Sequence, residues 1–175
     1  MNGTHIPWRC SQADHHAEFE CHRKFTSINA QLVCDKRGTV MSMSVGTAGG
    51  NCDATVFRHS GFAKRLEAKE WPGLPAVTIR GISIPPYGVC DGIYPCKPYL
   101  LKPYQGADIY LTPIQRLFNY CQSSTRQPIE HVNGMLKRRF RILSRQLELW
   151  SIDDAVNTIC ACVILHNLLV ARGEY

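Results

Sequence analysis

The chain has 175 residues, of which 45% are hydrophobic and 19% are charged. This length and composition are typical of one globular domain and exclude a wholly disordered chain. Residues 1–25 carry charges and histidines where a secretory signal has an apolar stretch, and the longest apolar run, Ile159–Val170, is too short to span a bilayer. We therefore expect one domain over 1–175 and no membrane association.

The net charge of +6 is concentrated in one stretch of the chain. Residues 116–145 carry seven basic side chains and one acidic side chain. A concentrated basic face favours binding to a polyanion such as DNA. A solvated helix face also explains these charges, and both interpretations stay open.

Nine cysteines are scattered along the chain without a CxxC pair. Their odd number and spacing favour reduced thiols in the cytosol or nucleus over a disulfide scaffold or a zinc site. The neighbouring residues His15, His16, Cys21 and His22 leave two interpretations open, a metal site or a polar loop.

The first half of the chain is predicted to be rich in strands. Strands are expected over Thr4–Trp8, Ser27–Asp35 and Thr39–Gly46, the last two joined as a hairpin. Loops are expected over 9–24 and over the glycine-rich residues 46–51. Helical periodicity then predicts one helix over Asp53–Lys69, which Trp71–Pro75 ends.

The second half is predicted to be mostly helical. A strand-rich stretch over Ala76–Ile84 and a short strand over Tyr87–Cys90 precede a long loop over 92–112. Helices follow to the end of the chain, with breaks near Ser123–Pro128 and Ser151. Strands followed by helices predict an α+β or α/β fold with one mixed sheet.

Glu130 lies on a predicted amphipathic helix. Its buried stripe consists of Ile129, Val132, Leu136, Phe140, Leu143 and Leu147, which recur at helical spacing. At about 100° per residue, Glu130, Gly134, Lys137 and Arg141 share one face at the edge of this stripe. The arrangement fits a metal-binding carboxylate beside phosphate-binding cations, and it also fits an exposed glutamate paired with neighbouring cations.

Six segments resemble, in the same order, segments of Harbinger-type DDE transposases. They are NGTHIPW at 2–8, SINAQLVCD at 27–35, GTAGGNCDATVF at 46–57, PPYGVCDGIYPCKPYLLKPY at 85–104, FNYCQSSTRQPIEHVNGMLKRRFRIL at 118–143 and CACVILHNLL at 160–169. The resemblance implies an RNase H-like α/β fold, a mixed sheet flanked by helices. It also implies a centre in which two aspartates and a glutamate hold two Mg²⁺ or Mn²⁺ ions for the cleavage of DNA.

The resemblance assigns roles to four residues. Asp91 and Glu130 match the second and third acidic positions, and Asp53 matches a further acidic position, where helix capping is the alternative role. The first acidic position is occupied by Asn2. An uncharged ligand costs a divalent cation several kcal/mol, since two unit charges 4 Å apart interact by about 4 kcal/mol at an effective dielectric of about 20. The predicted catalytic residues are thus Asp91, Glu130 and a weak Asn2, with Asp53 as a fourth metal ligand.

Three further positions depart from the family pattern. Cys52 replaces a histidine, and Asn133 replaces a phenylalanine beside the buried stripe. Pro128 precedes Glu130 by two residues, where it either kinks the helix or begins it. His166 in the closing motif is expected to be a hydrogen-bonded histidine inside a buried helix.

Three functional hypotheses follow. The first is a transposase-derived, divalent-metal-dependent DNA endonuclease or strand-transfer domain whose acidic triad is incomplete, which leaves enzymatic activity open. The second is a non-catalytic DNA-binding or protein-interaction remnant that uses Lys137, Arg138, Arg141 and Arg145. The third is a truncated product without activity.

The first two hypotheses predict DNA as the partner and a nuclear or cytoplasmic setting. The upstream DNA-binding region of such transposases is expected to be absent. A separate DNA-binding protein is then a further candidate partner, and an oligomer of the chain is also compatible with the sequence.

Overall fold

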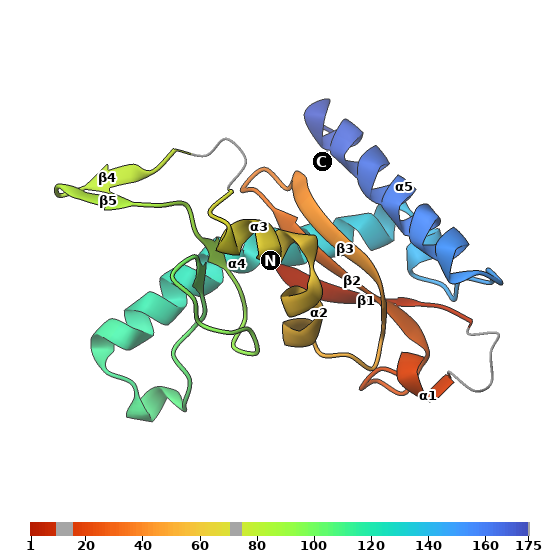
Figure 1. Ribbon diagram of the computed structural model, residues 1–175, viewed down its shortest axis with the longest axis horizontal. Helices are drawn as coiled ribbons and strands as arrows, with labels where there is room; N and C mark the ends of the chain where they lie inside the picture. Colours follow the sequence, from red (N-terminus) through yellow and green to blue (C-terminus); the bar gives the residue numbers. More distant parts are fainter. Residues whose placement is uncertain (10–15, 71–74, 175) are drawn as a thin grey trace.

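A computed structural model describes residues 1–9, 16–70 and 75–174. Three strands, β1 (Asn2–Pro7), β2 (Ser27–Cys34) and β3 (Val40–Ala48), form an antiparallel sheet in the order β1-β2-β3. Helices lie over both faces of this sheet (Figure 1). The fold is therefore α/β, as expected, although the described strands form three separate sheets and not one mixed sheet.

Strand β2 is buried on both of its faces. Ile28, Ala30 and Leu32 pack into an apolar core with α4 (Pro113–Arg139) and α5 (Ile152–Ala171). The alternate residues Ser27, Asn29 and Gln31 are equally buried but polar. Because side chains alternate along a strand, these three point to the opposite face, toward α2 (Asp53–His59).

A second core lies between α2, α3 (Gly61–Glu67) and the segment around β6 (Gly88–Val89). β6 pairs in parallel with β7 (Leu100–Leu101). The buried residues of this core are Met1, Phe57, Phe62, Ala63, Leu66, Cys90, Tyr94 and Leu100. The core fixes residues 90–94 beside α2, and this brings Asp91 toward the start of that helix.

The predicted helix over Asp53–Lys69 is two helices. Ser60 separates them, because its hydroxyl donates to the Phe57 carbonyl (2.7 Å), which ends α2, and accepts from the Ala63 N–H (3.1 Å), which caps α3. α3 ends at Glu67, and residues 71–74, the expected helix stop, lie outside the described residues.

The strand-rich stretch over Ala76–Ile84 is a hairpin. Its strands are β4 (Val77–Ile79) and β5 (Ile82–Ile84), joined at Arg80 and Gly81, which both have positive φ. Figure 1 shows this hairpin projecting from the rest of the fold. The short helices α1 (His16–Phe19), η2 (Asp108–Tyr110) and η3 (Arg141–Leu143) lie in the connecting segments.

Helix α4 corrects two expectations from the sequence. It begins at Pro113 with a capping box between Thr112 and Gln115, and it continues through the predicted break at Ser123–Pro128. Tertiary packing overrides weak helix propensity there, since Gln122 and Ile129 are buried on either side of the break.

The same helix ends earlier than its apolar stripe predicts. The last helical residue is Arg139, Phe140 is not helical, and the Ser144 hydroxyl donates to the free carbonyl of Lys137 (2.7 Å). Leu143 and Leu147 are buried from the segment that follows. The predicted alignment of Arg141 with Glu130 on one helix face is therefore wrong.

Helix α5 fastens the turn between β2 and β3. The His166 Nε2–H donates to the Gly38 carbonyl (2.9 Å), and its Nδ1 lies 3.1 Å from the Arg139 guanidinium. The Asn167 carboxamide exchanges two hydrogen bonds with the Val40 backbone (2.8 and 2.9 Å). The expected role of His166, a hydrogen-bonded residue of a buried helix face, is confirmed.

Only one face of α5 is buried. Ile159, Cys162 and Val163 join the core, whereas Ile164 and Leu168 are more than half exposed. Among the described helices, α5 alone is long and apolar enough to cross a membrane by length and composition. A helix that contributes one face to a protein core passes the same test.

Candidate active site

A cleft of about 800 Å³ runs along β1, the edge strand of the sheet. Its walls come from β1, the start of α2, the segment after β6 and the last turn of α4. Three predicted metal ligands and one predicted DNA-binding cation line it, namely Asn2, Asp53, Asp91 and Lys137. The fold thus brings together residues that are far apart in the sequence.

Asp53 is fixed against β1 beside Asn2. One carboxylate oxygen accepts the Gly3 N–H (3.1 Å), and the other accepts the Asn29 side-chain N–H (2.9 Å). The carboxylate approaches so closely that a Cβ added at Gly3 would lie 2.2 Å from Asp53 Oδ1. The residue at the N-cap of α2 is Cys52. Asp53 therefore links β1, β2 and α2.

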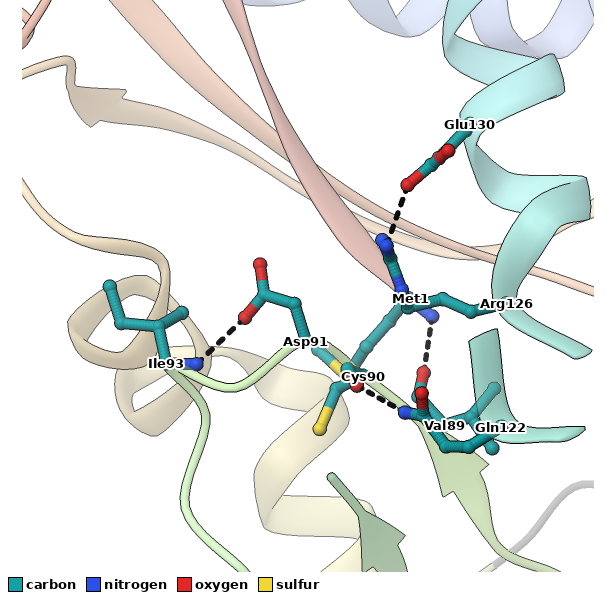
Figure 2. Close-up of polar contacts among 8 residues, drawn as sticks. All are labelled: Met1, Val89, Cys90, Asp91, Ile93, Gln122, Arg126 and Glu130. Atoms are coloured by element: carbon teal, nitrogen blue, oxygen red, sulfur yellow. Dashed lines mark hydrogen bonds and ion pairs between the residues drawn. The ribbon is translucent and has the colours of Figure 1, made fainter. Parts of the chain in front are cut away.

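Asp91 is positioned through Tyr94 and Gln31. The Gln31 side-chain N–H group donates both to the Asp53 carbonyl (3.0 Å) and to the Tyr94 hydroxyl (2.9 Å). Tyr94 is fully buried, and this burial raises the pKa of its hydroxyl. Asp91 itself accepts the Ile93 N–H through Oδ1 (2.9 Å), and its other oxygen has no hydrogen-bond partner among the described residues (Figure 2).

Glu130 is not among the residues that line the cleft. Figure 2 shows its carboxylate directed at the Arg126 guanidinium, 2.6 Å away. Glu130 precedes Lys137 by two helical turns, so both lie on the same side of α4. Arg126 therefore holds the third predicted acid, while Asn2, Asp53 and Asp91 share the cleft.

The donor atoms in the cleft fit a hard divalent cation in type. Carboxylate and carboxamide oxygens are the ligands that Mg²⁺ and Mn²⁺ prefer. The set consists of two carboxylates and one carboxamide, and no group of three His, Cys, Asp or Glu side chains poised for a metal occurs within 1–9, 16–70 and 75–174. The donor atoms therefore fit the cation in type, but the cleft has one carboxylate fewer than the two aspartates and one glutamate that the resemblance implies.

The four predicted DNA-binding cations do not share one face. Lys137 lines the cleft and donates to the His5 carbonyl (2.9 Å), and its burial, reinforced by Arg23, lowers the pKa of its ammonium group. Arg138 lines a different surface, beside the β2–β3 turn. Arg141 and Arg145 follow the end of the helix and are exposed.

Three residues of the cleft wall, His5, His22 and Arg23, were not predicted to belong to this site, although His22 was a candidate for a separate metal site or polar loop. His5 contacts the edge of the His22 ring (centroids 5.4 Å apart) and hydrogen-bonds Ser27 through Nδ1 (3.1 Å). Burial, followed by the proximity of His22, lowers the pKa of His5. His22 and Arg23 belong to a segment whose polar sequence is typical of a loop, and only its proximity to β1 in the fold reveals their place.

The described residues include eight cysteines, and all eight are free thiols. Burial raises the pKa of Cys34 to about 11 and that of Cys90 to about 12. Cys52 is exposed at the cleft, where the Thr55 hydroxyl lowers its pKa. Cys10 and His15 lie outside the described residues.

The family of the chain is decided by a sequence comparison. The sequence model described as DDE superfamily endonuclease matches residues 1–167. The chain belongs to this family. The resemblance to Harbinger-type transposases is thereby confirmed, because this DDE endonuclease domain is also similar to the Harbinger-derived nuclease HARBI1.

Curated relatives of this DDE endonuclease domain occur in animals and plants. "Putative nuclease HARBI1" of Homo sapiens is 28% identical over 149 residues, which cover 84% of this chain and 38% of that protein. "Protein ALP1-like" of Arabidopsis thaliana is 28% identical over 145 residues, covering 82% of this chain and 35% of that protein. The chain thus spans less than two fifths of the length of these relatives. No solved structure gives a significant match.

Proposed function

We propose that this DDE endonuclease domain binds DNA in the cleft along β1 and cleaves it weakly with the help of Mg²⁺ or Mn²⁺. The observation that supports this proposal best is the convergence of Asn2, Asp53 and Asp91 on one cleft. An RNase H-like fold is part of the proposal, supported by the family and by the helix–sheet–helix layering. The expected product is a cut phosphodiester with a free 3′-hydroxyl.

The cation would be held by Asp53 and Asp91, with the Asn2 carbonyl oxygen as a weaker ligand. When bound, such a cation activates water and stabilises the leaving oxygen of a phosphodiester. The chain contributes orientation. Asn29 and Gln31 fix Asp53, Tyr94 anchors the segment of Asp91, and Lys137 supplies positive charge next to the phosphate.

Asn2 explains why the activity is weak. At an effective dielectric of about 20, one missing unit charge at 4 Å removes about 4 kcal/mol per cation charge. Because about 1.4 kcal/mol corresponds to a tenfold change in affinity, the cation is expected to bind more weakly by orders of magnitude than it would beside an aspartate.

The test restores the missing charge. Asn2→Asp should raise Mn²⁺ affinity in isothermal titration and should raise Mn²⁺-dependent nicking of supercoiled plasmid. Asn157→Asp is the matched control, because it makes the same chemical change on an exposed position of α5. If Asn2→Asp has no higher Mn²⁺ affinity and nicking activity than the control, the active-site assignment is wrong.

A second candidate function is non-catalytic DNA binding. The Arg126–Glu130 ion pair favours it, because a carboxylate engaged with a guanidinium has less affinity for a metal. This function predicts DNA binding in EDTA that weakens with salt and is unchanged by Asp91→Asn. The endonuclease proposal predicts that the same substitution abolishes Mn²⁺-dependent nicking.

The setting of either function is proposed to be the nucleus, because the ligand is DNA. A separate DNA-binding protein is proposed to provide sequence recognition, and the chain is proposed to form an oligomer. Imaging of the tagged chain in cells, and pull-down with an untagged copy, test these two statements.

A further inference from the structure

Charges of both signs line the cleft. Asp53 contacts β1 at Gly3 and Lys137 contacts it at His5, while Asp91 and Arg23 line the same cleft. Lys137 reaches the His5 carbonyl from α4, whereas Arg23 comes from the segment before β2. The arrangement places two cations from distant parts of the chain beside a site suited to phosphodiester chemistry.

The two cations are close enough to influence each other. Arg23 and Lys137 line the same cleft, and the charge of Arg23 adds to the lowering of the pKa of Lys137 and of His5. Within residues 1–9, 16–70 and 75–174, no carboxylate forms an ion pair with either cation. Two like charges that line a cleft and form no ion pair attract an anion, and an anion between them relieves their repulsion.

We propose that Arg23 and Lys137 form a phosphate-binding subsite, which holds a backbone phosphate of a DNA strand whose neighbouring phosphodiester lies at Asp53 and Asp91. This inference rests on the proposed function, since it takes DNA as the occupant of the cleft. The Arg23 guanidinium can bind two phosphate oxygens at once, while Lys137 acts as a point charge at a fixed depth. The subsite sets the direction in which the strand lies along β1.

The subsite does not require the divalent cation, so it is tested without one. A fluorescein-labelled single strand and the corresponding duplex are titrated with the full chain in EDTA, at several salt concentrations, and anisotropy gives Kd. The variants are Arg23→Gln, Lys137→Gln and the double variant. The control is Lys64→Gln combined with Arg65→Gln, which removes two exposed cations of α3 that do not line the cleft.

The double variant should bind DNA at least tenfold more weakly than the control. The slope of log K against log salt should become less negative by about 0.7 to 0.9 for each phosphate that the protein no longer neutralises. Lys137→Arg should keep most of the affinity, and thermal melts monitored by circular dichroism show whether each variant is folded. If Lys137→Gln is unfolded, Arg23→Gln and Lys137→Arg carry the test.

Two results would overturn the subsite. One is a double variant with the Kd and salt slope of the control, and the other is a parent chain that does not bind either form of DNA. The outcome is separable from that of the endonuclease proposal. If the double variant loses DNA binding and Asn2→Asp gains no nicking activity, the subsite is supported and the endonuclease proposal is wrong. If the double variant binds DNA like the control and Asn2→Asp gains nicking activity, the endonuclease proposal is supported and the subsite is wrong.

Discussion

The Arg126 guanidinium lies 2.6 Å from the Glu130 carboxylate, one helical turn away on α4 (Figure 2). Half of the Glu130 side chain is exposed, so the pair contributes little to stability, less than about 1 kcal/mol. Its larger effect is on the electrostatics of the site. The guanidinium neutralises Glu130, the acid that is predicted to be the third metal ligand.

Replacing this guanidinium should strengthen metal binding. In the Asn2→Asp background, Arg126→Gln should increase Mn²⁺ affinity several-fold in isothermal titration, because it frees Glu130 and removes a positive charge from its neighbourhood. Arg65→Gln in the same background is the control, since this exposed arginine lies on α3. Equal Mn²⁺ affinities for the two variants would mean that Glu130 takes no part in the site.

Gly3 should tolerate no side chain. A Cβ at this position would lie 2.2 Å from Asp53 Oδ1, so Gly3→Ala forces the carboxylate away from β1. We expect a loss of about 1–3 kcal/mol in the free energy of unfolding, measured with urea. Gly134→Ala is the matched control, since an added Cβ there has no neighbour within 4 Å and the position is inside α4.

The control should move in the opposite direction. Alanine in place of glycine inside a helix stabilises by about 0.5–1 kcal/mol. If the two variants show the same change in unfolding free energy, the close approach of Asp53 to β1 is not what requires a glycine at position 3.

Asn133 should be replaceable with a gain in stability. Its buried side-chain oxygen has no hydrogen-bond partner among the described residues and borders a small apolar cavity lined by Ile6, Leu136 and Leu143. An unsatisfied buried polar group costs about 1–3 kcal/mol, so Asn133→Leu should raise the melting temperature. An unchanged or lower melting temperature would show that the carboxamide is satisfied in solution.

A second asparagine of α4 provides the comparison. Asn119 exchanges two hydrogen bonds with the Tyr104 backbone (2.8 and 3.0 Å), so Asn119→Leu should lower the melting temperature. The two substitutions are chemically identical, so opposite changes in melting temperature would reflect the different surroundings of the two side chains.

Acid should destabilise the fold through His166. Burial lowers the pKa of this side chain below its ordinary value of 6.5, and its Nδ1 accepts a hydrogen bond from Arg139, so the neutral form is the one that folds. The stabilisation is complete above pH 6.5 and is lost as pH falls below that value toward the folded-state pKa.

The measurement is the melting temperature between about pH 7.5 and about pH 5, the range in which a histidine titrates. His166→Gln should be less stable than the parent at the upper end of this range, yet its melting temperature should fall less steeply with acid. His5 has a lowered pKa of the same sign, so some acid dependence remains. A variant with the acid dependence of the parent would exclude His166 as its source.

The sequence by itself determined the features that depend on local geometry. The alternation of Ser27, Asn29 and Gln31 with Ile28, Ala30 and Leu32 specifies a strand with one polar and one apolar face, because side chains alternate along every strand. The spacing of Glu130 and Lys137 places both on one side of a helix, because seven residues are about two helical turns. The family motifs, including Asn2 at an acidic position, are equally legible in the sequence.

Only the tertiary structure decided which side chains meet. Gly3 and Asp53 are 50 residues apart in the chain, and Lys137 and His5 are 132 apart, so no local pattern connects them. The end of α4 at Arg139 was likewise set by a contact, the Ser144 hydroxyl on the Lys137 carbonyl, although the apolar spacing continued. Contacts between distant residues depend on how helices and strands pack against one another. The periodicity of apolar residues predicts each helix or strand separately and does not predict which of them pack together.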